Sequence, residues 1–216
     1  MSCCLHTRDA GRFFSRMARR ERRRYERRGL ERSQRELFAG IEQADFAGAS
    51  LLEIGCGVGY LHQRLLEAGA GRAMGVDLSA RMLEEARAGA QASGLATRTE
   101  YREGDFLEIS EKLTDADIVI LDKVICCYPD AQGLVERSLA KARRVYAFTV
   151  PRDRAFVRFG AGVMALALRL LCSRFRPYVH DPEAIDSWLR QQGFSLLYRA
   201  QTPIWQSSVY RRRGSP

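Results

Sequence analysis

Residues 51–61, LLEIGCGVGYL, place three glycines within five positions between an apolar run and a helix-like segment that begins near Tyr60. A strand that ends in Gly-Cys-Gly-Val-Gly and turns into a helix brings bare backbone close to a ligand, with the helix N-terminus nearby. Tyr60 stands where a dinucleotide fingerprint would have its third glycine, and no Lys followed by Ser or Thr completes a phosphate-cradling loop. The turn therefore predicts a ligand site of another kind.

Short apolar runs alternate with helical patterns beyond residue 50, which is typical of a parallel sheet with helices on both faces. The predicted strands are 51–54, 73–76, 99–102, 118–121, 145–150, 194–198 and 204–210. The predicted helices are 60–68, 79–93, 130–141 and a last one that starts at the cap Asp181 and Pro182 and ends near Gln192, with Gly193 as its stop. Only residues 200–203 separate the last two strands, so we expect an antiparallel hairpin.

The formal net charge of +9 belongs mainly to the two ends of the chain. Residues 8–36 hold 12 Arg against 5 acidic residues, and residues 211–213 add three Arg, so the remainder is close to neutral. Residues 9–44 are predicted to form one or two basic helices with a break at Gly29. We therefore expect an N-terminal basic helical extension, 1–47, before a domain over 48–216. A nucleic-acid partner is not expected, because the domain itself carries little charge.

No apolar run reaches the roughly 18 residues of a membrane span, and the N-terminus lacks the apolar core of a secretory signal. A cytoplasmic protein is expected. The six cysteines include two adjacent pairs, Cys3–Cys4 and Cys126–Cys127, and predict reduced thiols rather than a disulfide scaffold. Adjacent cysteines chelate poorly and no spaced histidine completes a zinc set, so no metal site is expected. His6 and His62 are expected to face solvent.

Two further acidic residues follow predicted strands. Asp77, in GVDLS, could accept both ribose hydroxyls of a nucleoside, and Asp105, in EGDFLE, could accept a bond from an exocyclic amine with Phe106 against a ring. Each acid alone is more often an ordinary turn residue. Ligand-type residues at three successive strand ends nevertheless indicate a nucleoside ligand.

Four segments resemble, in order, the motifs of the class I S-adenosylmethionine-dependent methyltransferases over residues 48–213: LLEIGCGVG, GVDLSARML, REGDFLE and ADIVILDKVICCYPD. The resemblance implies a doubly wound, seven-stranded Rossmann-like α/β sheet with its last strand antiparallel, and S-adenosyl-L-methionine as cofactor. It also implies that Glu53 and the turn hold the methionine end, that Asp77 holds the ribose and that Asp105 and Phe106 hold the adenine. The implied cofactor-binding residues are Glu53, Gly55, Cys56, Gly57, Gly59, Asp77, Leu78, Asp105, Phe106 and Asp122.

The fourth segment is the place to look for acceptor contacts. Tyr128 is a candidate substrate contact, and His180, which precedes the penultimate helix, is the first choice for a general base. An aromatic residue after a strand is more often a packing residue, and a helix-capping or surface role is at least as common for a histidine such as His180. The absence of N-P-P-Y or D-P-P-Y argues against exocyclic-amine methylation of bases, and the order C-C-Y-P differs from the P-C or T-C of cytosine-C5 enzymes.

A partial likeness to the magnesium-protoporphyrin O-methyltransferases rests on the N-terminal aromatic-and-Arg helices, the DIVILDKVICCYP segment and the length. Cys127 stands where those enzymes have a histidine, which separates this chain from them. A lid-like helical insertion is predicted over 155–180, because 156–172 is apolar nearly all round. A lid on a lipophilic acceptor, a dimer contact and a membrane-surface helix would all look like this.

The sequence thus predicts an enzyme that methylates a small or medium-sized, partly lipophilic molecule at oxygen. One alternative is an RNA or protein methyltransferase that uses the Arg-rich N-terminal helix to hold an acidic partner. The other is a non-catalytic binding protein that retains the fold, against which the intact glycines, Asp77 and Asp105 speak. Neither the oligomeric state nor the identity of the acceptor follows from the sequence.

Overall fold

The computed structural model describes residues 3–171 and 173–214, with side chains from residue 9 on. Its sheet has seven strands in the order β3-β2-β1-β4-β5-β7-β6. The strands are β1 (Ser50–Ile54), β2 (Arg72–Asp77), β3 (Thr99–Glu103), β4 (Ala116–Asp122), β5 (Ala142–Pro151), β6 (Phe194–Gln201) and β7 (Trp205–Arg212). Strands β1 to β5 pair in parallel, whereas β7 is antiparallel to both β5 and β6. The predicted sheet, including the closing hairpin, is confirmed.

The helices of the domain follow the predicted pattern. The α-helices are α1 (Cys3–Arg28), α2 (Arg32–Glu42), α3 (Tyr60–Glu67), α4 (Ala80–Ala92), α5 (Phe106–Ile109), α6 (Ala131–Ala140), α7 (Ala155–Leu170) and α8 (Pro182–Gln191). The side chains of Ser79, Asp130 and Asp181 cap α4, α6 and α8 by accepting backbone N–H groups. Sequence analysis missed only the single-turn helix α5 and three short 3-10 turns, Ala96–Arg98, Ser110–Lys112 and Ile125–Cys127.

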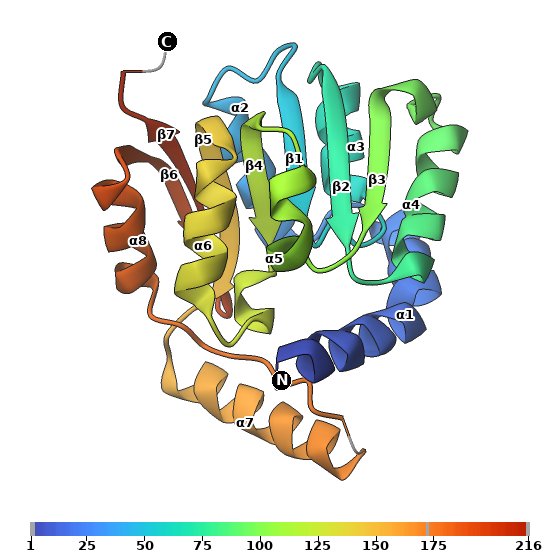
Figure 1. Cartoon of the computed structure of the whole chain (residues 1–216), viewed down its shortest axis with the longest axis vertical. Coiled ribbons are helices and arrows are strands. Elements are labelled where there is room, and N and C mark those ends of the chain that lie inside the picture. Colours follow the sequence, from blue (N-terminus) through green and yellow to red (C-terminus); the bar gives the residue numbers. More distant parts are fainter. Residues whose placement is uncertain (1–2, 172, 215–216) are drawn as a thin grey trace.

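Helices cover both faces of the sheet and bury two apolar clusters (Figure 1). On one face, Leu134 of α6 and Leu189 of α8 pack against the strands. On the other face, Leu37 of α2 and Leu65 of α3 do the same. Because the central strands are buried on both sides, they are nearly continuous apolar runs, and this is why they could be found in the sequence.

Helices α1 and α7 lie beyond the carboxyl ends of the parallel strands (Figure 1). Gly29, with φ +66°, separates α1 from α2 as predicted. Helix α1 crosses to α4, where Arg22 pairs with Glu85 at 2.8 Å. Among the described helices, none combines the length and apolar character needed to cross a membrane.

Candidate active site

The glycine turn between β1 and α3 depends on left-handed backbone. Gly55, Gly57 and Gly59 have φ values of +64°, +54° and +79°, which L side chains rarely adopt. A Cβ on Gly55 would stand 2.4 Å from Cγ2 of Val124, so the turn packs tightly against the end of β4. A Cβ on Gly57 would meet nothing within 4 Å. The backbone at Gly57 therefore borders open space, as a turn that receives a ligand requires.

Asp77, at the end of β2, binds the turn directly. Its Oδ2 accepts the backbone N–H of Gly57 at 2.8 Å, and its Oδ1 accepts that of Ser79 at 2.9 Å. Burial raises the pKa of Asp77 to about 6, although these two hydrogen bonds act to lower it. Each carboxylate oxygen can accept more than one bond, so Asp77 can hold the turn and still accept from a ligand hydroxyl.

Glu53 lies behind the turn in a buried polar chain. Its Oε2 is 2.5 Å from Nδ1 of His62, and Nε2 of His62 is 3.0 Å from the hydroxyl of Tyr101, which also accepts from Gln63. Burial raises the pKa of Glu53, and the contact with His62 opposes this shift. The prediction that His62 faces solvent is wrong. The side chain is 0 % exposed, because Glu53 supplies the partner that a buried imidazole needs.

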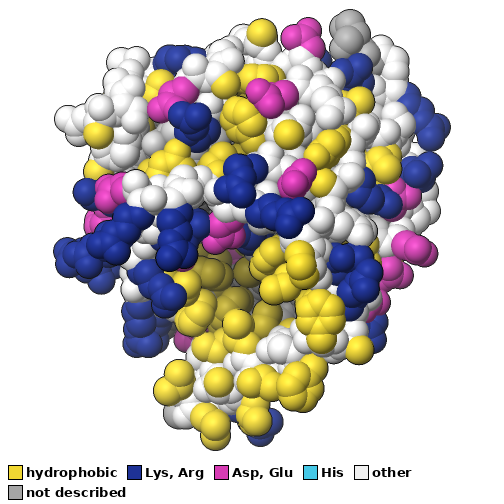
Figure 2. All heavy atoms as spheres, turned by 180° about the vertical axis from the view of Figure 1, so that it is seen from behind, with side chains coloured by type: hydrophobic (Ala, Val, Ile, Leu, Met, Phe, Trp, Pro, Cys, Tyr) yellow, Lys and Arg dark blue, Asp and Glu magenta, His cyan; other side chains and the backbone are white. Residues whose placement is uncertain are grey.

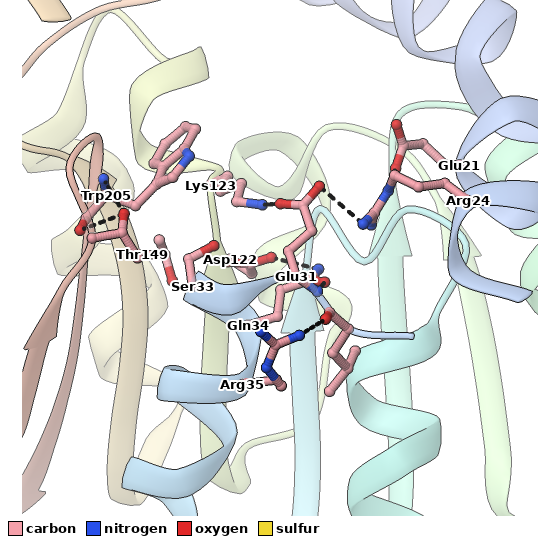
Figure 3. A network of polar contacts seen from close by, with 12 residues as sticks. Glu21, Arg24, Glu31, Ser33, Gln34, Arg35, Asp122, Lys123, Thr149 and Trp205 are labelled. Atoms are coloured by element: carbon pink, nitrogen blue, oxygen red, sulfur yellow. Dashed lines mark hydrogen bonds and ion pairs between the residues drawn. The ribbon is translucent and has the colours of Figure 1, made fainter. Parts of the chain in front are cut away.

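The end of β4 meets the start of α2. Nε2 of Gln34 donates to Oδ2 of Asp122 at 2.9 Å, while Oδ1 of Asp122 is buried and accepts no bond from any described residue. Lys123 follows with φ +60°, an uncommon value for a residue with a side chain, and its Nζ bonds Glu31 and lies 5.3 Å from the ring centroid of Trp205. Figure 3 shows these groups converging from β4, α2 and β7.

Glu31 connects this end of β4 to the extension. Its Oε1 lies 3.1 Å from Nη1 of Arg24, whose Nε is 3.1 Å from Glu21 (Figure 3). Burial acts to raise the pKa of Glu31, but Lys123 and Arg24 outweigh it and the pKa lies below its usual value. Glu31 therefore stays ionised at neutral pH. The two N-terminal helices are held to the sheet by charge as well as by packing.

Asp105 and Phe106 start helix α5. Oδ1 of Asp105 accepts the backbone N–H of Leu107 at 3.0 Å and the hydroxyl of Tyr128 at 2.9 Å. Phe106 is buried against the core and lines the cavity, whereas Asp105 is not among the residues that line it. Burial raises the pKa of Tyr128, so its hydroxyl stays protonated and donates to Asp105. Tyr128 thus positions the carboxylate that sequence analysis assigned to the adenine.

His180 does not line the cavity. Its Nε2 is 2.9 Å from the backbone carbonyl of Tyr128, and its ring stacks on Tyr178 with centroids 5.7 Å apart. Burial lowers the pKa of His180. The imidazole therefore supports the loop after β4, and its role as a general base stays a prediction that this geometry does not favour.

The described cysteines are free thiols in packed positions. Cys56 is buried, and burial raises its pKa. Cys127 lines the cavity, and its contact with Cys126 together with burial raises its pKa as well. Neither is a ready thiolate nucleophile. Cys3, Cys4, Cys172 and His6, named in the sequence predictions, lie outside the residues whose side chains the structure describes.

A cavity of about 440 Å³ joins these groups. Its floor comes from the predicted residues of the β1 and β2 ends, and its cover comes from α1 and the start of α2. Five carboxylates and a single described cation line it: Glu21, Glu31, Glu53, Asp77, Asp122 and Lys123. The surplus of negative charge suits a cationic ligand such as a sulfonium with an ammonium group. Ala10 and Phe14 of α1 contribute to the cover, whereas no residue of α7 lines the cavity.

Several residues of this site were not predicted from the sequence. Gln34, Glu31 and Lys123 carry no motif that marks them as site residues, and Trp205 lies on the last strand. The one available signal is the spacing of Glu31 and Gln34, which form a capping box at the start of α2. That signal predicts where a helix starts. It does not predict that Gln34 contacts Asp122, 88 residues further along the chain.

Comparisons with known proteins agree with this geometry. The solved magnesium protoporphyrin IX methyltransferase of Synechocystis PCC 6803 with bound SAM superposes with a TM-score of 0.70 and 19% identity, covering 96% of this chain and 97% of that one. The ubiquinone biosynthesis O-methyltransferase of Pseudomonas fluorescens is 25% identical over 162 residues, which are 72% of this chain and 68% of that protein. An uncharacterized methyltransferase of Geobacillus kaustophilus is 28% identical over 193 residues, 82% of this chain and 86% of that protein.

The fold is that of the class I S-adenosylmethionine-dependent methyltransferases, and the relatives and solved structures that the chain resembles are methyltransferases. The resemblance carried by the four sequence motifs is thereby confirmed. Residues 51–147, from β1 into β5, match the family described as Methyltransferase domain. This segment contains the glycine turn, Asp77, Asp105 and Asp122, whereas α1 and the start of α2, which cover the cavity, lie outside it.

Proposed function

We propose that this methyltransferase binds S-adenosyl-L-methionine in the cavity at the carboxyl ends of β1, β2 and β4, and methylates an oxygen of a small, partly lipophilic acceptor. The observation that carries the proposal is the meeting of the open turn at Gly57, the buried carboxylate of Asp77 and the unpaired Oδ1 of Asp122 in one cavity. The O-methyltransferase from Pseudomonas supports oxygen as the acceptor atom.

The residues present fit this cofactor on three counts. The space beside Gly57 leaves room for a ligand against bare backbone, and Asp77 would accept from the ribose hydroxyls. The buried, unpartnered Oδ1 of Asp122 would accept from a donor such as the amino-acid ammonium group, which removes the cost of leaving it unpaired. Phe106 lines the cavity and offers an apolar ring to the adenine, whereas Asp105, which does not line it, would act by fixing the start of α5. Glu53 would act through the turn, since its Oε2 is engaged by His62.

When bound, the cofactor supplies a methyl group on a positively charged sulfur. The chain's part is to align the acceptor oxygen and exclude water, and alignment of this kind contributes on the order of 7 to 11 kcal/mol to lowering the barrier. Ala10, Phe14 and Tyr60 give the cavity apolar walls that suit a lipophilic acceptor. Glu31, which lines the cavity, is a weak base because its pKa is lowered.

Calorimetric titration with S-adenosyl-L-methionine tests the site, with the Asp77→Ala variant beside the wild type. The variant should bind at least about tenfold more weakly, or about 1.4 kcal/mol, because a charged hydrogen-bond acceptor is lost. A screen of lipophilic phenols and carboxylic acids with methyl-labelled cofactor then tests the acceptor class. Unchanged affinity of Asp77→Ala would exclude the site, and labelling of RNA or protein alone would exclude the acceptor class.

The Arg-rich helix α1 favours one second candidate, a methyltransferase of RNA or of an acidic protein. Its arginines border a shallow groove: Arg16, Arg19, Arg20, Arg23, Arg24, Arg27 and Arg28. Phosphate contacts release counterions, so RNA binding by this groove would weaken steeply as salt is raised. A cytoplasmic location remains part of the proposal, and it accords with the free thiols Cys56, Cys126 and Cys127.

A further inference from the structure

Helix α7 carries an apolar stripe on its outer side. Its members recur at intervals of three and four residues, so they share one helix face. They are Phe156, Phe159, Val163, Leu166 and Leu170, each between 53 and 77 % exposed. Leu171, at the end of the helix, extends the stripe with 76 % exposure. An apolar face of this kind is costly in water and indicates a surface that something covers.

The opposite side of α7 is already packed against the protein. Val157 and Leu168 are buried, and Leu168 forms a small cluster with Ala10 of α1 and with Phe175. The ring of Phe175 also contacts those of Phe13 and Phe14, at centroid distances of 5.4 and 5.5 Å. Because its inner face has partners of its own, the helix cannot bury the outer stripe by turning over.

Positive charge accompanies the stripe. Residues 154–180 contain no Asp or Glu and five arginines: Arg154, Arg158, Arg169, Arg174 and Arg176. The helix α1, which packs beside α7, adds the seven arginines of its groove. Figure 2 shows hydrophobic side chains gathered at the lower end of the molecule, where α7 lies, with Lys and Arg side chains beside them. An apolar stripe flanked by arginines suits a surface that is apolar inside and anionic outside.

A second copy of the chain is a poorer occupant of this stripe. Two facing α7 helices would bring Arg154 and Arg169 of both copies close together, and no acidic residue lies within 154–180 to offset the repulsion. Asp153, just outside that range, already pairs with Arg158. A bilayer with anionic lipids offers both an apolar boundary for the stripe and negative head groups for the arginines.

We propose that α7 binds the surface of an anionic membrane, with the stripe from Phe156 to Leu170 at the acyl boundary and the flanking arginines at the head groups. The helix would lie in the plane of the interface. Its inner residue Leu168 packs on α1, whose Ala10 and Phe14 line the cavity. Membrane binding therefore places the covered side of the active site next to the lipid, where a lipophilic acceptor is concentrated.

Vesicle co-sedimentation of the full chain tests this proposal. We expect binding to vesicles of phosphatidylcholine with phosphatidylglycerol, and much weaker binding to phosphatidylcholine alone, with added salt reducing the difference. Phe159→Ser with Leu166→Ser should lower the partition coefficient by at least about tenfold, because two exposed anchors lose their apolar area. Leu196→Ser, at an exposed apolar position on the edge strand β6, should leave binding unchanged.

Two controls give each outcome a meaning. Calorimetry with S-adenosyl-L-methionine should give the same affinity for the double variant as for the wild type, which shows that the fold is intact and separates this test from that of the proposed function. Arg169→Gln with Arg174→Gln should weaken binding to the anionic vesicles alone. Equal vesicle binding by Phe159→Ser/Leu166→Ser, or sedimentation of the wild type as a dimer that this variant dissociates, would overturn the proposal.

Discussion

The floor and the cover of the cavity are built differently. The floor is a turn whose Gly57 N–H binds Asp77 only 20 residues away, and its geometry comes from backbone. The cover depends on side chains far apart in the chain: Gln34 reaches Asp122 across 88 residues, and Lys123 reaches Glu31 across 92. A backbone turn has one shape, whereas side-chain pairs at the surface can break and form again. The floor is thus suited to a constant cofactor, and the cover to an acceptor that differs between enzymes.

The buried pair behind the floor should give the largest effect. His62→Ala leaves Glu53 without its partner in a fully buried position, so we expect the free energy of unfolding to fall by about 3 kcal/mol. Denaturant titration measures this change. Glu53→Gln is the milder comparison, since an amide oxygen can still accept from His62. A loss below about 1 kcal/mol for His62→Ala would show that the pair is not a structural support.

A substitution that fills the open space beside the glycine turn should give the second-largest effect. Gly57→Val forces a β-branched residue into the left-handed region and fills the space beside the turn, so cofactor affinity should fall about a hundredfold. Gly94→Val is a matched control, because Gly94 has φ +68°, also borders open space and lies outside the cavity lining. It should carry a similar strain and bind the cofactor normally. Equal affinities for the two variants would contradict the role of Gly57.

The protonation of Asp77 should make cofactor binding depend on pH. Burial raises its pKa to about 6, so the carboxyl is ionised at pH 7 and mostly protonated at pH 5. A protonated carboxyl no longer attracts the cationic cofactor, and affinity should therefore fall about tenfold as the pH drops from 7 to 5. Calorimetry at both values measures this. Asp77→Asn has no such group, and its affinity, weaker at neutral pH, should be flat across the window; the same slope in both proteins would refute the assignment.

The cover should respond least to a single change. Lys123→Met removes the ion pair with Glu31 and keeps an aliphatic chain near Trp205. Both partners are partly exposed, so stability should change by less than about 1 kcal/mol, and cofactor affinity should stay within about twofold. The KM of the acceptor, once identified, is the quantity that should rise. A large loss of cofactor affinity would instead show that Lys123 belongs to the cofactor site and not to the cover.

The contrast between local backbone structure and long-range side-chain contacts also explains which features could be predicted from the sequence. The strands, the break at Gly29 and the cap at Asp181 are local patterns, and each was predicted within a few residues. The contact of Gln34 with Asp122 depends on how α2 returns to the sheet, which no local pattern carries.

His62 shows the limit most clearly. Its polar side chain predicts exposure, yet the partner that permits its burial, Glu53, is on the preceding strand and becomes visible only when the turn is built. Asp105 is a second example. Its Oδ1 accepts the hydroxyl of Tyr128, which lies on the loop after β4, and the sequence around Asp105 does not indicate that contact.

A crystal structure with S-adenosylhomocysteine, the spent form of the cofactor, tests the central claim most directly. We predict the ribose hydroxyls within hydrogen-bond distance of Asp77, and the amino-acid end between the turn at Gly57 and the free Oδ1 of Asp122. A ligand bound away from the ends of β1 and β2, with these groups unchanged, would contradict the assignment of the site.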